Sequence, residues 1–214
     1  LVYSSDYLSD DEAADSLLKN LDGTLLTEPR QLRFKAGMRR VFWQQNCVAL
    51  GLAGGFIEPL ESTSISLIQT GLEKLMQSMP ELEVTESAVA QANRLNRAEY
   101  ERIRDFIILH YKASGRRDTA FWRDVSAMDV PDTLTEKMRA FTEDGCILLG
   151  EQESFTEQSW IALFHGLGLR PRVLPAPVQR LDTQKLTHMV DGMARSIILG
   201  AQCAPSHQEF LRTL

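Results

Sequence analysis

The chain has 214 residues, of which 43% are apolar and 24% are charged, and its formal net charge is −6. This balance is typical of a globular protein with a buried core, and it excludes a disordered tail, a collagen-like repeat and a disulfide-stapled miniprotein. A sequence pI near 5.3 argues against a dedicated nucleic-acid binder. We therefore expect no nucleic-acid partner and no membrane partner.

The charge pattern along the chain predicts neither a membrane span nor a secretory leader. The longest uncharged run, residues 41–57, contains Gln, Asn and Gly and is shorter than the roughly 20 apolar residues of a spanning helix. The first residues show no basic segment followed by an apolar one. Because the chain does not begin with Met, we expect it to be a piece of a longer protein.

The cysteines and histidines are too scattered to predict a structural site. Cys47, Cys146 and Cys203 form no C-x-x-C pair, and the histidines are equally dispersed. This spacing indicates neither a disulfide framework nor a metal site. Reduced thiols are typical of a bacterial cytoplasm, so we expect a cytoplasmic protein.

The first 60 residues carry short segments with the character of strands. Three segments predict strands: residues 2–7, residues 31–36 and the more buried residues 41–52. Between the first two, Ser9 and Glu12 have the spacing of a capping box and predict a helix that ends near Gly23. We interpret this part as the edge of a sheet that continues elsewhere.

Beyond residue 60 the apolar residues recur with the period of a helix. The expected helices cover residues 63–79 (stopped by Pro80), 86–112, a segment capped by Asp118 or Thr119, a segment opened by Pro131 with a capping box at residues 133–136, residues 156–165, a segment from Thr183, and a short one capped by Ser206. A proline-rich connection covers residues 170–177. The predicted fold class is α+β.

Residues 51–65 combine a glycine turn, a proline and a helix start, and they carry the most chemical information. Glycine lets the backbone approach a flat or phosphate-bearing ligand closely. The backbone N–H groups of Ser62, Thr63 and Ser64 are expected at the positive end of the following helix, where an anion binds favourably. Glu61 lies beside them, and composition alone favours a first-turn acid that complements the helix dipole.

The pattern Phe56-x-x-Pro59-x-x-Ser62-Thr63 resembles the loop that joins the flavin and halogenation sites in the flavin-dependent tryptophan halogenase family. The resemblance extends in order through six further stretches: residues 2–13, 43–51, 104–112, 118–123, 155–160 and 205–207. It implies that residues 1–61 are the last strands of a flavin-monooxygenase-like sheet domain. It also implies that residues 62–214 form a mainly α-helical substrate-binding region.

The resemblance also implies roles for individual residues. Glu61 matches the active-site glutamate, which acts together with a lysine on the oxidising halogen species. The backbone amides of Thr63 and Ser64 match the halide site. The expected flavin contacts are Gly51, Ala53, Gly54 and Ile65, and the expected substrate contacts are His110, Tyr111, Phe121 and Trp122.

Two positions depart from the pattern of members that act on free tryptophan. His110-Tyr111 stands where such members often carry two tyrosines, and Arg117 stands where they often carry a glutamate for the ammonium group. An arginine there repels an ammonium group. We therefore expect free L-tryptophan to be a poor substrate compared with an indole, phenol or pyrrole-like ring, or with an aromatic group held on a peptide or carrier.

The resemblance implies FAD, reduced by a separate flavin reductase, with chloride or bromide and O₂ as co-substrates, and a homodimer is possible. The family's dinucleotide fingerprint, catalytic lysine and Trp-x-Trp-x-Ile-Pro motif are not found in these 214 residues. The chain therefore resembles the C-terminal half of a halogenase, incomplete by itself. Two alternatives stay open: a flavin monooxygenase that hydroxylates an aromatic ring, and an inactive helical fragment that serves as an interaction module.

Overall fold

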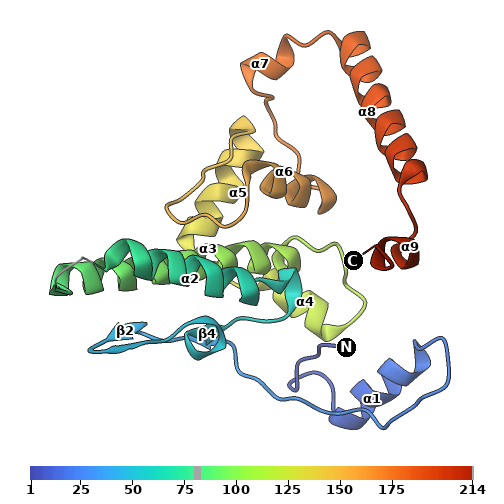
Figure 1. Ribbon diagram of the computed structural model, residues 1–214. Coiled ribbons are helices and arrows are strands. Elements are labelled where there is room, and N and C mark those ends of the chain that lie inside the picture. The colour runs from blue at the N-terminus through green and yellow to red at the C-terminus, as the bar shows by residue number, and fades with distance from the viewer. Residues whose placement is uncertain (80–82, 214) are drawn as a thin grey trace.

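The computed structural model describes residues 1–79 and 83–213, and Figure 1 shows a chain dominated by helices. The helices are α1 (Asp10–Lys19), α2 (Ser64–Ser78), α3 (Glu86–Lys112), α4 (Ala120–Ala127), α5 (Asp132–Asp144), α6 (Glu157–Gly166), α7 (Ala176–Gln179), α8 (Thr183–Cys203) and α9 (His207–Leu211). Short strands and 3₁₀ turns lie before α2: β1 (Gly37–Met38), β2 (Trp43–Gln44), β3 (Cys47–Val48), η1 (Gly51–Ala53), β4 (Gly55–Phe56) and η2 (Leu60–Ser62). The mixture agrees with an α+β chain whose described strands form two small antiparallel sheets, β1 with β4 and β2 with β3.

The strands predicted at residues 2–7 and 31–36 are wrong. Residues 4–8 form a turn, because the N–H groups of Tyr7 and Leu8 both donate to the carbonyl of Ser4 at 3.1 Å. Residues 31–36 pair with no strand among the residues described, and Leu32 is 73% exposed. An alternating sequence makes a strand only where a neighbouring chain accepts its backbone hydrogen bonds.

The single strand predicted at residues 41–52 is a hairpin instead. β2 pairs antiparallel with β3 around Gln45, whose φ is 53°. The side chain of Asn93 on α3 takes the place of another strand: its Oδ1 accepts from the N–H groups of Phe42 (2.7 Å) and Trp43 (2.8 Å), and its Nδ2 donates to the Trp43 carbonyl at 2.9 Å. The apolar run is thus buried against a helix, which periodicity alone does not distinguish from burial in a sheet.

The glycine turn lies between η1 and β4 and is packed against two helices. β4 pairs antiparallel with β1, with Phe56 opposite Gly37. The hydroxyl of Tyr100 on α3 is 3.2 Å from the carbonyls of Gly51 and of Gly55. Gly51 has a φ of +54°, and a Cβ atom there would lie 2.5 Å from the Ile68 side chain of α2. This close approach to α2 explains why the turn begins with glycine.

Most predicted helix starts are confirmed. Ser9 and Ser206 each form a complete capping box, and Thr119 and Thr156 cap α4 and α6 through their side chains. α2 and α3 lie where the apolar period placed them, whereas Pro80 lies outside the described residues. The proline-rich connection ends in the short helix α7.

Two helix-end predictions are wrong. α1 ends at Lys19, with Asn20 as its C-cap, rather than near Gly23. α5 follows Pro131 without a side-chain cap, so residues 133–136 lie inside the helix and form no capping box. The hydroxyl of Thr133 donates instead to the buried carboxylate of Asp105 on α3. Thr133 thus bonds a side chain on another helix instead of capping the backbone of its own helix.

The long helix α3 is the centre of the fold, because it contributes to both apolar clusters. One cluster joins α3 to α5 and α6 through Phe106, Leu109, Leu134, Phe141, Trp160 and Phe164. The other joins α3 to α2 and the hairpin through Phe42, Leu67, Tyr100, Ile103 and Ile107. In Figure 1, α2 and α3 run side by side above the strands, so residues near the end of α3 are held against the loop before α2.

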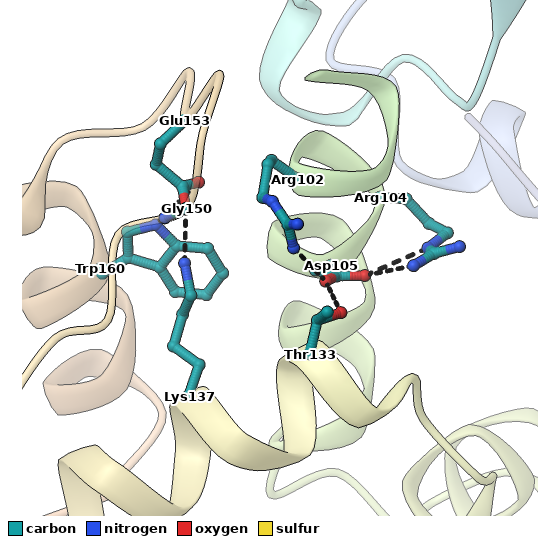
Figure 2. Close-up of polar contacts among 8 residues, drawn as sticks. All are labelled: Arg102, Arg104, Asp105, Thr133, Lys137, Gly150, Glu153 and Trp160. Carbon is teal, nitrogen blue, oxygen red and sulfur yellow. Dashed lines mark hydrogen bonds and ion pairs between the residues drawn. The ribbon is translucent and has the colours of Figure 1, made fainter. Parts of the chain in front are cut away.

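Buried charges tie α3, α5 and the segment before α6 together (Figure 2). The Lys137 ammonium of α5 lies 2.6 Å from Glu153 and 3.8 Å from the centroid of the Trp160 ring. Burial is the main cause of a lowered pKa for Lys137. On α3, the Asp105 carboxylate accepts from Arg104 at 2.8 Å and from Thr133. Pairing of this kind is what makes charged side chains tolerable in a core.

The last three helices extend away from this core. None of the residues of α7, α8 or α9 is buried, and Figure 1 shows α8 standing apart from α5 and α6. Met189, Met193 and Ile197 on α8 are each more than half exposed. None of the described helices is both long enough and apolar enough to span a membrane.

Candidate active site

Glu61 sits at a strained joint between η2 and α2. Its φ is 66°, and the next residue, Ser62, has a φ of 52°. Each non-glycine residue in this left-handed region costs roughly 1–3 kcal/mol, and such residues cluster at functional sites. Neighbouring residues in this conformation turn the chain sharply before α2 begins at Ser64.

The carboxylate of Glu61 reaches the end of α3. Its Oε1 atom lies 3.1 Å from Nε2 of His110, and the two side chains are 33% and 23% exposed. The other ring nitrogen of His110, Nδ1, lies 3.0 Å from the backbone carbonyl of Phe106 one turn earlier. Glu61 is therefore a largely accessible acid whose carboxylate lies within ion-pair distance of a histidine.

The start of α2 leaves backbone donors open. The N–H groups of Thr63 and Ser64 have no hydrogen-bond acceptor among the residues that the structure describes, and the Thr63 side chain does not cap the helix. Ser62 differs from the prediction, because its N–H donates to the Pro59 carbonyl at 3.1 Å. Two open donors at the positive end of a 15-residue helix favour a bound anion.

Aromatic side chains gather beside His110. Tyr111 stacks with Trp122 at a centroid distance of 6.0 Å, and Phe121 meets Trp122 edge-on at 5.1 Å. Tyr7 packs edge-on against Phe121 at 5.3 Å. The structure thus brings together three of the predicted substrate contacts. Tyr7 was not predicted, because no local pattern links it to a ring more than a hundred residues away.

Tyr111 is held by a carboxylate that the sequence analysis did not single out. Its hydroxyl donates to Glu58, with oxygen distances of 2.7 Å and 3.0 Å. Burial and then the Glu58 contact raise the pKa of the Tyr111 phenol, so this side chain stays neutral. The position of Glu58 inside the Phe56–Ser62 pattern was the available signal. Glu58 and Glu61 thus bind neighbouring residues of α3.

The arginines lie at the edge of the aromatic group. The guanidinium of Arg116 stands 4.4 Å from the centroid of the Trp122 ring and pairs with Asp118 at 2.7 Å. Arg117 is exposed, and its guanidinium turns back to the carbonyl of Ser114 at 2.6 Å. The positive charge that contacts the ring therefore comes from Arg116 and not from Arg117.

The residues expected to contact flavin fall into two kinds. Gly51 and Gly54 are buried, and a Cβ atom at Gly54 would lie 3.1 Å from the Phe42 ring. Ala53 is exposed, and Ile65 is 80% exposed at the start of α2. Ala53 is small, and Ile65 is an exposed apolar residue next to the free backbone donors of α2. Both suit contact with a flat aromatic cofactor that lies along the turn.

The lysines do not supply a partner for Glu61. Within the described ranges, no lysine nitrogen lies within 4.0 Å of its carboxylate, and Lys74 and Lys137 are used in buried ion pairs. Lys112 donates to the Met128 carbonyl at 2.6 Å. The described part of the chain also contains no group of three side chains suited to hold a metal ion.

Comparison with known protein families identifies the family of this chain. Residues 1–183 match the family model described as "Tryptophan halogenase". The chain belongs to the tryptophan halogenase family. Among solved structures, BrvH, a flavin-dependent halogenase from Brevundimonas sp. BAL3, is 42% identical with a TM-score of 0.90, over 100% of this chain and 43% of that one.

Other members of the family give the same picture. Xcc4156, a flavin-dependent halogenase from Xanthomonas campestris, is 43% identical with a TM-score of 0.90, over 99% of this chain and 43% of that structure. The 7-chloro-L-tryptophan 6-halogenase KtzR from Kutzneria sp. (strain 744) is 33% identical over 65% of this chain and 27% of its own length. The chain therefore spans less than half the length of these halogenase relatives.

Proposed function

We propose that the protein carrying this chain halogenates an electron-rich aromatic substrate, using reduced FAD, O₂ and chloride or bromide. The observation that carries the proposal is the position of Glu61. It lies between the open amides at the start of α2 and His110 on α3, whose neighbour Tyr111 stacks on Trp122. An anion site, an acid and an aromatic surface are thus adjacent.

The amides of Thr63 and Ser64 are assigned to the halide. Backbone donors at a helix N-terminus bind a small anion without a charged side chain. Glu61 stands next to these amides and has two roles. It orients the halogen donor, and it accepts the ring proton that leaves the substrate.

Gly51, Ala53, Gly54 and Ile65 are assigned to the flavin. The exposed Ala53 and Ile65 supply the contact surface, while the buried Gly51 and Gly54 let the turn lie flat against Ile68 and Phe42. When bound, reduced FAD supplies the oxidising equivalents by reaction with O₂. A separate flavin reductase is the assigned source of the reduced cofactor.

The substrate ring is assigned to Tyr111, Phe121 and Trp122. Stacking of an aromatic ligand on such rings contributes about 0.5–1.5 kcal/mol beyond burial. The guanidinium of Arg116 over Trp122 is paired with Asp118, but the exposed Arg117 beside it has no ion pair among the described residues. This end of the site therefore keeps a positive charge, which disfavours the ammonium group of free L-tryptophan. A neutral or anionic indole-like ring, or one held on a peptide or carrier, is the preferred substrate.

The two parts of the chain follow these roles. Residues 1–61 are assigned to the end of the flavin-binding sheet domain, because they contain the glycine turn and Glu61. Residues 62–214 are assigned to the substrate-binding region, because they contain Tyr111, Phe121 and Trp122. A cytoplasmic location and a homodimer stay predictions.

The test is a product analysis with the purified protein that carries this chain, FAD, a flavin reductase and a panel of indoles and phenols. Reactions in chloride and in bromide are expected to give products whose masses differ by the exchange of one halogen. A halide-free control is expected to give no product. A hydroxylated product whose formation is independent of halide would show a monooxygenase instead.

A further inference from the structure

The hydroxyl of Tyr111 joins the end of α3 to the loop that carries Glu61. It donates to the two carboxyl oxygens of Glu58, at 2.7 Å and 3.0 Å. Glu58 lies between β4 and η2, three residues before Glu61. Within the described ranges, Glu58 forms no ion pair, and Tyr111 is the one side chain that donates a hydrogen bond to it. The Glu58 carboxyl group therefore has a single described task, which is to hold this phenol.

We propose that Glu58 is a positioning residue that fixes the Tyr111 ring against Trp122. It thereby sets where an aromatic substrate lies relative to Glu61. The proposal rests on the proposed function, because that function assigns the substrate ring to Tyr111, Phe121 and Trp122. Glu58 itself needs no contact with the substrate or the halide, since it acts through the Tyr111 hydroxyl.

The backbone around Glu58 is anchored on both sides. Ile57 packs against the apolar cluster that joins α3 to α2 and the hairpin, and Tyr111 packs against the same cluster. Pro59 follows with a φ of −70°, a value that its own ring enforces. The preceding strand β4 is paired with β1. The carboxyl group thus extends from a well-held segment, as a group that orients another side chain must.

Tyr111 is the member of the aromatic group that comes from α3, whereas Phe121 and Trp122 come from α4. Its ring stacks on Trp122 at a centroid distance of 6.0 Å and an interplanar angle of 22°, and it meets Phe121 edge-on at 6.0 Å. A half-buried phenol can turn about its side-chain torsions unless both ends are held. The contact with Glu58 holds the far end, so it fixes the plane that the ring presents to α4.

A loose Tyr111 ring should impair the reaction more than it impairs binding. An aromatic substrate can still stack on a ring that moves, so its affinity changes little. The rate depends on the distance between the reacting atoms, and a displacement of about 1 Å can cost about a hundredfold. Loss of the Glu58 contact should therefore lower kcat more than it raises KM.

The first test reads the contact without turnover. The protein that carries this chain is labelled with ¹³C at the ζ carbon of tyrosine, and Tyr111→Phe identifies the Tyr111 signal by its loss. Burial and then the Glu58 contact raise the pKa of Tyr111, so Glu58→Leu should shift this signal and lower that pKa. Glu73→Leu, at an exposed acid on α2, should do neither. A Tyr111 signal that Glu58→Leu leaves unaltered would overturn the proposal.

The second test asks whether Glu58 acts through Tyr111. Product formation is measured in Glu58→Leu, in Tyr111→Phe and in the double variant. We expect each single variant to lower kcat about tenfold while KM changes less than about threefold. The double variant should be no slower than either one, because both changes remove the same hydrogen bond. Losses that multiply in the double variant would contradict the proposal, since Glu58 would then act independently of Tyr111.

A conservative variant separates the hydrogen bond from simple packing. Glu58→Gln keeps a carbonyl oxygen that can accept from the Tyr111 hydroxyl, so it should recover most of the rate that Glu58→Leu loses. If Glu58→Leu does not fold, the comparison of Glu58→Gln with Tyr111→Phe decides. A nearly normal rate for Glu58→Gln and a slow one for Tyr111→Phe support the proposal, and a normal rate for Tyr111→Phe overturns it.

The outcomes also separate this proposal from the proposed function. If the protein makes no halogenated product but the Tyr111 signal responds to Glu58→Leu, Glu58 positions the ring and the assigned reaction is wrong. If halogenation occurs equally fast in the unaltered protein and in Glu58→Leu, the reaction stands and the positioning role fails.

Discussion

Lys74 of α2 and Glu99 of α3 form an ion pair in which each side chain is only 5% exposed. Glu99 also accepts from Thr70 at 2.9 Å and from Ser154 at 3.1 Å. One carboxylate thus joins α2, α3 and the segment before α6. Because α2 begins at the expected halide site, this pair holds that site against the core.

Removal of one partner of the Lys74–Glu99 pair should therefore destabilise the folded protein. We expect Lys74→Met to lower the free energy of unfolding by about 3–5 kcal/mol, since it leaves the Glu99 charge buried without compensation. The double variant Lys74→Met with Glu99→Gln should recover part of the loss. The exposed pair of Arg94 with Glu151 is the control, and Arg94→Gln should leave urea unfolding unchanged. If Lys74→Met lowers the free energy of unfolding as little as Arg94→Gln does, the buried pair does not stabilise the fold.

Tyr100 predicts how stability changes at alkaline pH. Burial, followed by the nearby Glu99 charge, raises the pKa of Tyr100 to about 12. The folded state therefore keeps this proton at pH values where the unfolded chain has lost it. The stabilisation is fully present below the pKa of the unfolded chain, about 10, and is lost as pH rises toward 12, by at most about 1.4 kcal/mol per pH unit.

Unfolding at a series of alkaline pH values checks this expectation. Tyr100→Phe removes the titrating hydroxyl, so its free energy of unfolding should fall less steeply above pH about 10 than that of the unaltered protein. Identical slopes for the unaltered protein and Tyr100→Phe would refute the argument.

The charge at the aromatic group predicts a substrate order. Indole, tryptamine and indole-3-acetate share one ring and carry no charge, a positive charge and a negative charge. Because Arg116 lies over Trp122, we expect kcat/KM to be lowest for tryptamine. Arg116→Gln should narrow the difference between tryptamine and indole-3-acetate. Arg139→Gln, on the exposed side of α5, should not change it. A preference for tryptamine in the unaltered protein would contradict the assignment of this end of the site.

The helices were predictable because their signals are local. The extents of α2 and α3 follow from apolar periodicity, and the caps at Ser9, Thr156 and Ser206 follow from side chains that bond their own backbone within three residues. The strands failed for the opposite reason. Residues 31–36 alternate as a strand does, but a strand exists only with a partner that the alternation does not specify.

The roles of the candidate site residues rest on a motif and stay predictions. Glu61, Thr63 and Ser64 were located through the Phe56–Thr63 pattern, but their mutual geometry was not. The contact of Glu61 with His110, and that of Tyr111 with Glu58, join residues roughly fifty positions apart. No local rule predicts such pairs, and the assignment of His110 to the substrate stays a prediction.

The central claim, that Glu61 serves halogenation, is tested most directly by Glu61→Gln. In the protein that carries this chain, supplied with reduced FAD, O₂, bromide and an indole, we measure halogenated product and flavin oxidation in the same sample. Glu73→Gln, an exposed acid on α2, is the control. The account predicts that Glu61→Gln forms product at least about a hundredfold more slowly while flavin oxidation continues at its normal rate. Equal product from Glu61→Gln and the unaltered protein would contradict it.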